Sequence, residues 1–374
     1  MSTDTCTRAP GDASTQAGPP AAPVARSLAL DRLRGLALVA MLVHHLTEWL
    51  TGDARAVLPG WPSFAVTDVA AIAFFCTAGA SVALFTAARR RRGASRRGVA
   101  IDIARRYGLL VPIGVVLHWL LWRDPLSFGV LEALGVTVVL AAAVIAVVPA
   151  RLLPAAAAAV LAAGVWSERL ADARHGWLAE EVLGGTFPLV TYLGFVLVGV
   201  AAARTGRLED RRWVAAAAVV ATGAVLVMAV EGIVPDRYPG DVPFLVPGLA
   251  GTAIVYFLAQ FGWPAALAGV DSDVRRAGTR ALGIFMAHYL LFGLLRRAGV
   301  THALDAATAI PLALAITATL CVLAPHVPQL PWSPRTGSRR PAAAGPAGPA
   351  PGHVVAPPAP AEPGIAGARQ TSRL

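Results

Sequence analysis

The sequence predicts an all-α protein, a polytopic membrane bundle of about ten transmembrane helices with both termini in the cytoplasm. Hydrophobic residues make up 56% of the 374 positions, charged residues only 14%, and the mean hydropathy is +0.61. Apolar windows long enough to cross a bilayer recur along most of the chain. Arginines alternate between dense and sparse loops. Such a composition is too apolar for a soluble globular protein.

Each expected helix is an apolar window near the length of about twenty residues that crosses a hydrocarbon core of ~30 Å. The segment 152–170 is interrupted by small residues and charge, and 303–324 by proline. The predicted spans are 33–51, 64–88, 107–122, 127–149, 152–170, 187–203, 213–231, 244–263, 280–296 and 303–324.

The orientation follows from the arginines, which supply all 32 positive charges because the chain contains no lysine. A cytoplasmic N-terminus places most of them on the cytoplasmic side, as the positive-inside rule requires. We therefore interpret the net charge of +10 as a topology signal and expect no nucleic-acid partner, since no aromatic-basic motif accompanies it. The cytoplasmic arginines are Arg89 to Arg92, Arg96, Arg97, Arg105, Arg106, Arg204, Arg207, Arg211, Arg212, Arg275, Arg276 and Arg280.

The domain organisation is simple. Residues 1–25 are rich in Pro, Ala, Ser and Thr and predict a disordered N-terminal segment, not a signal peptide. Residues 26–324 form the transmembrane domain, and 325–374 predict a disordered Pro/Ala-rich cytoplasmic tail. The three cysteines have no ligand-like spacing, so we expect no metal.

Ionisable residues inside the apolar helices are the candidate functional groups, because such residues are costly in a membrane unless they have a partner or a wet cavity. His45 lies about 16 Å along the first helix from Arg34, toward the outer face. Glu48 follows it by three residues, so Arg34, His45 and Glu48 share a helix face, whereas His44 points elsewhere. Asp68, His118 and Glu132 are expected in the same outer half of the membrane.

Imidazoles and carboxylates that converge from four helices would suit proton transfer. A structural interpretation stands beside this one. Glu48, Asp68 and Glu132 are equally compatible with solvated residues at the headgroup level, and His118 with a belt residue beside its neighbouring tryptophans. His288, in the late apolar segment 280–296, is a further candidate on the same grounds.

Four stretches occur in an order that resembles a known superfamily. They are Leu30-Asp31-Arg32-Leu33-Arg34-Gly35 with Met41 and His45, then Thr67-Asp68 with Phe74-Phe75-Cys76-Thr77-Ala78-Gly79-Ala80-Ser81, then Phe187-Pro188 with Gly199, and Leu282-Gly283 with His288. Together they resemble the membrane acyltransferase superfamily that joins the bacterial acyltransferase-3 proteins to the heparan-α-glucosaminide N-acetyltransferase-like proteins. The resemblance covers about Leu30 to Phe292.

The resemblance implies an enzyme of the cell membrane that uses cytoplasmic acyl-CoA, most simply acetyl-CoA, as co-substrate. Its acceptor would be a hydroxyl or amine of a sugar or other cell-envelope molecule. By the first-helix motif the catalytic role falls on His45, with Glu48 or Asp68 holding its imidazole. Either general-base catalysis or an acyl-histidine intermediate fits these residues.

The phosphates of the donor require cations, for which Arg34, Arg89 and Arg92 are candidates, with Asp31 capping the first helix or pairing with Arg34. The arginine-rich loop also fits a stop-transfer and lipid-anchoring role. A proton-coupled transporter or exporter is the alternative function, because it would use the same buried histidine and carboxylates. The sequence shows no convincing inverted repeat for that alternative.

Overall fold

A computed structural model describes residues 27–53, 61–122, 128–172, 176, 179, 183–233, 235 and 242–327. The chain divides into two units, Met1–Trp332 and Ser333–Leu374, and every described residue belongs to the first. The predicted N-terminal segment 1–25 lies outside the described residues, as do residues 328–374 of the predicted tail 325–374. The first residues of that tail belong to a 3-10 turn, Ala324–His326.

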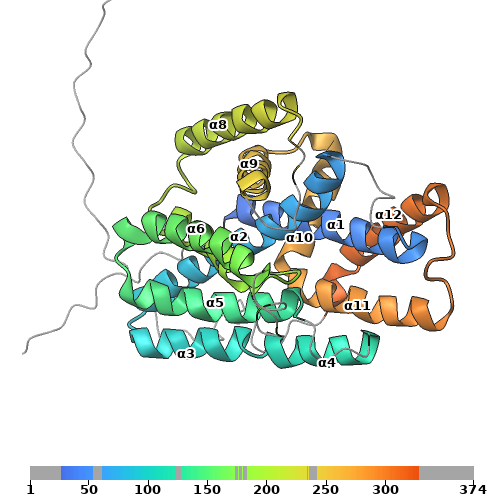
Figure 1. The fold of residues 1–374 in the computed structure, drawn as a ribbon, viewed down its shortest axis with the longest axis horizontal. Helices are drawn as coiled ribbons and strands as arrows, with labels where there is room; N and C mark the ends of the chain where they lie inside the picture. The colour runs from blue at the N-terminus through green and yellow to red at the C-terminus, as the bar shows by residue number, and fades with distance from the viewer. Residues whose placement is uncertain are drawn as a thin grey trace, which may run out of the picture. The chain divides into compact units, whose positions relative to one another are not determined.

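The described residues form α-helices and short 3-10 turns, and none of them forms a strand (Figure 1). This confirms the all-α class. The helices are α1 (Leu28–Thr51), α2 (Trp61–Arg91), α3 (Arg96–Tyr107), α4 (Leu110–Trp122), α5 (Val130–Val147), α6 (Leu153–Asp172), α7 (Leu189–Arg204), α8 (Arg211–Val230), α9 (Val242–Ala259), α10 (Ala268–Thr279), α11 (Ala281–Arg297) and α12 (Ala306–Val322).

Each of the ten predicted ranges contains a helix, and the structure adds α3 and α10, which the hydropathy windows missed. Both added helices are short and polar. α3 carries arginines at both ends. Its N-terminal cap is Ser95, whose side-chain oxygen accepts a hydrogen bond from the amide of Gly98. α10 has charged residues on one face and meets α11 at a bend of 85°. The periodicity of polar residues could have indicated α10, which hydropathy does not.

Five described helices are long and apolar enough to cross a membrane, or six if the bent pair α10 and α11 counts as one span. The prediction of about ten spans counted helices that do not pass this criterion. α7 and α12 are apolar but only 16 and 17 residues long. At 1.5 Å per residue the 13-residue α4 reaches about 20 Å, less than the hydrocarbon core. The first two turns of α1 contain three charged residues, Asp31, Arg32 and Arg34, so the start of this helix is not apolar.

Helices α2 and α7 pack closely against one another. Glycines on both helices allow it. A Cβ atom at Gly79 would collide with the backbone carbonyl of Val196, and one at Gly199 with that of Cys76. Small residues are what membrane helices use to approach closely. α1 packs beside this pair and also contacts α10, α11 and α12, so residues from the end of the chain reach the first helix.

The start of α1 is held to α10 by a buried ion pair. Arg32 donates through Nε to Asp271 Oδ1 at 2.6 Å and through Nη2 to Asp271 Oδ2 at 3.1 Å. Its Nη1 donates to the carbonyls of Ala259 and Phe261 at 3.0 and 3.1 Å. Gly35 and Gly278 allow the two backbones to touch. This joint sets where the rest of α1, including His45, lies in the bundle.

Candidate active site

His45 of α1 meets His288 of α11 in the interior of the bundle. His45 Nδ1 lies 3.2 Å from His288 Nε2, and the two rings are stacked at 15° with centroids 5.4 Å apart. His288 is completely buried, whereas His45 is half-buried. His45 and His288 are 243 positions apart in the sequence, and the packing of α11 on α1 brings them together.

The hydrogen bonds of His288 determine where the protons of this pair sit. His288 Nδ1 contacts the carbonyl oxygen of Phe285, which can only accept, so this nitrogen carries the N–H. In neutral His288 the Nε2 atom is then an acceptor. His45 Nδ1 must donate to it, which places the lone pair of neutral His45 on its Nε2 atom. That atom is the one suited to take a proton or to attack a carbonyl carbon.

Aromatic rings enclose the histidine pair. Trp49, one turn after His45, stacks on His45 and on His288 with centroid separations of 5.6 and 5.3 Å. Phe292 lies 4.1 Å from Trp49, and Tyr289 lies 4.4 Å from His288. These rings immobilise both imidazoles and limit the access of water on their side of the pair.

The two carboxylates predicted to orient His45 have other neighbours. Glu48, whose side chain is 39% exposed, lies 3.6 Å from Nε2 of His44, the residue one turn earlier. Asp68 accepts a hydrogen bond of 2.7 Å from the hydroxyl of Thr67. The imidazole of His288 contacts the ring of His45, and spacing along one helix could not predict this partner from α11. The roles of Glu48 and Asp68 in orienting His45 stay predictions.

A second ionisable pair joins α4 and α5. His118 Nδ1 lies 2.8 Å from Glu132 Oε1, and Glu132 is only 1% exposed. Two glycines make room for this pair. A Cβ atom at Gly114 would lie 2.5 Å from both carboxylate oxygens, and one at Gly129 would lie 2.7 Å from His118 Nε2. His118 is thus a partner of a buried carboxylate, which favours the functional interpretation over an interfacial belt residue.

Arg34 marks the opposite end of α1 from His45. Its guanidinium lies 3.5 Å from Asp31 Oδ1, and it donates to the Ser81 hydroxyl at 2.5 Å and to the carbonyl of Gly278 at 3.3 Å. Asp31 therefore pairs with Arg34, while Ser27 caps the helix. Tyr107 at the end of α3 is nearby. Its desolvation raises the pKa of the phenol, and the charge of Arg34 opposes this rise.

The other two predicted donor-binding arginines differ in their surroundings. Arg89 forms an ion pair with Asp102 of α3, a partner that the sequence analysis did not consider. Arg92, just past the end of α2, is exposed. Neither contacts Arg34 in the described structure, although all three lie toward the arginine-rich ends of their helices.

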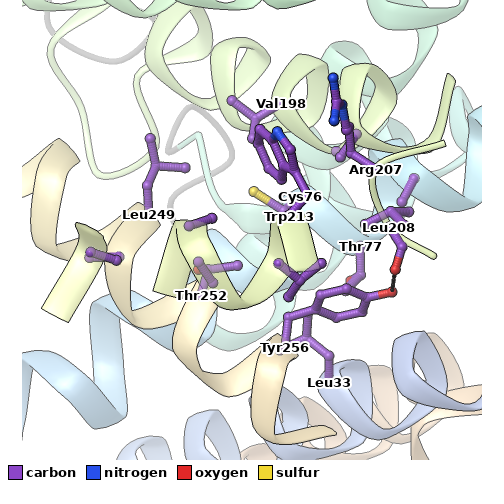
Figure 2. A pocket seen from close by; sticks show the side chains of 18 of the residues that line it. Leu33, Cys76, Thr77, Val198, Arg207, Leu208, Trp213, Leu249, Thr252 and Tyr256 are labelled. Carbon is purple, nitrogen blue, oxygen red and sulfur yellow. Dashed lines mark hydrogen bonds between the residues drawn. The ribbon is translucent and has the colours of Figure 1, made fainter. Parts of the chain in front are cut away.

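A large apolar cavity of about 610 Å³ lies elsewhere, between α8, α9 and the α2–α7 pair (Figure 2). Figure 2 shows Trp213 and Arg207 near one another at its edge, and Tyr256 donating to the carbonyl of Leu208. Its lining contains none of the predicted catalytic residues. The cavity therefore does not coincide with the histidine pair.

Sequence reasoning missed several neighbours of the site. Tyr289 directly follows His288, and Trp49 lies four residues after His45. The local sequence does not show that both rings contact the same histidine pair. Three partners of arginines lie on a helix other than that of the arginine: Asp271, Asp102 and Ser81. Within the part of the chain that the structure describes, no three His, Cys, Asp or Glu side chains gather as a metal-ligand set.

Comparison with known proteins adds one finding. A family model described as "Heparan-alpha-glucosaminide N-acetyltransferase, catalytic" matches residues 26–233, more than half of the 374-residue chain. The match includes α1 to α8 and so contains His45, His118 and Glu132, whereas His288 lies beyond it. No curated protein matches the chain.

Proposed function

The chain belongs to the heparan-alpha-glucosaminide N-acetyltransferase catalytic family, and on this premise we propose that it is a multi-pass membrane acyltransferase. It would move an acyl group, in the first instance acetyl, from acyl-CoA to a hydroxyl or amine of a sugar or other envelope acceptor. The observation that carries the proposal is the contact of His45 with His288, which places the basic lone pair of neutral His45 on its Nε2 atom.

The proposed reaction uses that nitrogen. His45 Nε2 takes the proton of the acceptor hydroxyl or amine as the acceptor attacks the thioester carbonyl. The carbon–sulfur bond then breaks, and the departing CoA thiolate receives the proton from His45. His288 accepts the hydrogen bond from His45 Nδ1 throughout, which keeps the ring oriented and the correct tautomer populated. Glu48 and Asp68 remain proposed contributors from the outer half of the helices.

An acyl-histidine intermediate would use the same lone pair. In that case His45 Nε2 attacks the thioester carbon, CoA leaves as the thiolate, and the acceptor then attacks the acyl-imidazole. Both routes require His288 Nε2 to accept the hydrogen bond from the Nδ1–H group of His45. A quench in acid followed by peptide mass analysis would detect acylated His45 on the second route only.

The donor would bind from the arginine-rich side, which we propose is cytoplasmic. Arg34 lies eleven residues, about 16 Å of helix, before His45 on the same face of α1. A guanidinium offers several N–H donors to phosphate oxygens, so Arg34, with Arg89 and Arg92 nearer the surface, would contact the charged part of CoA. The thioester would then reach toward His45 along the bundle.

The test is transfer from radiolabelled acetyl-CoA by the purified protein in proteoliposomes, with amino sugars and envelope extracts as acceptors. We expect label transfer by the wild type and a loss of at least about 100-fold in His45→Ala. His326→Ala is the matched control, because this histidine lies exposed in the short turn after α12. Turnover in His45→Ala equal to that of the control would exclude the proposed mechanism.

A further inference from the structure

A small pocket on the far side of α2 from Arg34 is lined by three arginines. It has a volume of about 110 Å³ and lies where the ends of α2, α5 and α7 meet the start of α3. Arg90, Arg96 and Arg204 line it, each from a different helix, and Thr86 lies one turn before Arg90. Among its described lining residues there is no Asp or Glu.

The pocket is separate from the candidate active site. Ser81 marks the face of α2 that meets Arg34. Because successive residues of a helix are rotated by about 100°, Thr86 and Arg90 point about 140° and 180° away from that face. The histidine pair lies farther still, toward the other end of α1. The arginines that we assign to the donor, Arg34, Arg89 and Arg92, do not line this pocket.

The three guanidinium groups retain most of their hydrogen-bonding capacity. Each arginine side chain offers five N–H donors. Arg96 donates one to the carbonyl of Ala146, and Arg90 donates one to the carbonyl of Ala94. Arg204 forms no side-chain hydrogen bond or ion pair with the described residues, and it is half-buried in the last turn of α7. A concentration of unneutralised donors of this kind is what a phosphate group binds.

The hydroxyl of Thr86 provides an independent observation. Its oxygen is buried, and it has no hydrogen-bond partner among the described residues. A threonine in a helix usually satisfies its hydroxyl on the carbonyl four residues earlier, as Thr137, Thr205 and Thr252 do here. A buried polar group without a partner is costly, and a ligand oxygen in the pocket would remove that cost.

We propose that this pocket binds a phosphate group, held by Arg90, Arg96 and Arg204 with the Thr86 hydroxyl as a further donor. The pocket is small enough for a phosphate and little else, and it lies at helix ends where a phospholipid headgroup or a phosphate from solution can arrive. Its occupation would join α2, α3 and α7 at one end of the bundle.

The experiment measures binding by the purified full-length chain in neutral detergent. The midpoint of thermal unfolding is followed with sodium phosphate against sodium chloride at equal ionic strength, and with phosphatidylglycerol against phosphatidylcholine in the micelles. We expect a phosphate-specific rise in the midpoint for the wild type. Arg204→Gln should weaken the apparent affinity at least tenfold, and the isosteric Thr86→Val should weaken it by a smaller factor.

Arg212→Gln is the matched control, because this exposed arginine lies on α8, away from the pocket. Saturation by inorganic phosphate alone would assign the site to free phosphate, whereas binding only of phosphatidylglycerol would assign it to a lipid headgroup. Equal shifts with phosphate and chloride and with both lipids would overturn the proposal. The proposal would also be overturned if Arg204→Gln and Thr86→Val bound phosphate with the same apparent affinity as the control variant Arg212→Gln. Since the readout is binding, the result is independent of acyl transfer.

Discussion

At the scale of single residues, two imidazoles 3.2 Å apart behave as one unit in this bundle. The backbone carbonyl of Phe285 sets the tautomer of His288, and His288 sets the tautomer of His45. A backbone carbonyl or a carboxylate often plays this part for a histidine. Here the Nε2 atom of His288 accepts a hydrogen bond from His45 Nδ1.

The first prediction concerns His288. In His288→Phe the ring still packs against Trp49 and Tyr289, but His45 loses its hydrogen-bond acceptor. We expect kcat to fall by about 100-fold or more, since general-base catalysis of this type contributes 10²–10⁴-fold, with little change in KM for acyl-CoA. Steady-state kinetics measure both. Leu290→Ala, at an exposed position of α11, is the control, and a wild-type kcat in His288→Phe would contradict the assignment.

The second prediction concerns the glycine beside Glu132. A Cβ atom in Gly114→Ala would lie 2.5 Å from both carboxylate oxygens, so the pair of Glu132 with His118 must shift. We expect the free energy of unfolding to fall by about 1–3 kcal/mol, the usual cost of overpacking. Gly223→Ala on α8 is the control, because nothing lies within 4 Å of its Cβ position and alanine favours a helix.

Denaturation of both glycine variants in detergent, followed by circular dichroism, measures the difference between them. Equal free energies of unfolding for Gly114→Ala and Gly223→Ala would mean that the space beside Glu132 accommodates a methyl group. A loss of stability in Gly114→Ala alone would support the close packing of the carboxylate against α4.

At the scale of elements, α1 is held by α10 at its start and by α11 near its end. The ion pair of Arg32 with Asp271 and the backbone contact through Gly35 and Gly278 hold the first turns of α1 against α10. Since α10 leads directly into α11, the same joint positions His288. The Asp-x-x-Arg-Gly segment that resembles an acyltransferase motif is therefore also a packing motif.

The third prediction tests this joint. Arg32→Gln leaves Asp271 buried with only Arg275, which lies 3.0 Å away, so we expect a loss of about 3 kcal/mol in the free energy of unfolding. The double substitution Arg32→Gln with Asp271→Asn should restore part of the lost free energy of unfolding, because the buried carboxylate charge is then removed as well. Arg276→Gln breaks the exposed pair with Asp273 and should cost less than about 1 kcal/mol. Denaturation of the four proteins gives the comparison, and equal costs for the Arg32 and Arg276 variants would refute a clamping role.

At the scale of the whole molecule, the ionisable groups separate along the bundle. Five arginines lie toward one end of the bundle, namely Arg34, Arg89, Arg90, Arg96 and Arg204. The pair of His45 with His288 and the pair of His118 with Glu132 lie on other turns of the helices. Such a separation is what a reaction requires when its donor and acceptor come from opposite sides of a membrane. The family match ends at residue 233, so the α11 half of the histidine pair is supplied by the chain after it.

The fourth prediction concerns orientation. The excess of arginine at one end predicts that this end and both termini face the cytoplasm. We expect a green fluorescent protein fused after Leu374 to fluoresce and an alkaline phosphatase fused there to be inactive. A phosphatase fusion in the segment between α4 and α5 should be active. The opposite pattern would reverse the proposed direction of acyl transfer.

The sequence by itself determined the all-α membrane class and the approximate positions of ten helices, because hydropathy is a local property. Its prediction that His45 is catalytic rests on buried charge and stays a prediction. It also indicated that His118, Glu132 and His288 are unusual in apolar helices, but it did not identify their partners. Only the tertiary structure paired His45 with His288 and His118 with Glu132. The spacing on α1 suggested Glu48 as the orienting group, since sequence periodicity relates residues within one helix. Which helix stands opposite depends on packing, here on Gly35, Gly278 and the ion pair of Arg32, and these contacts link residues more than two hundred positions apart.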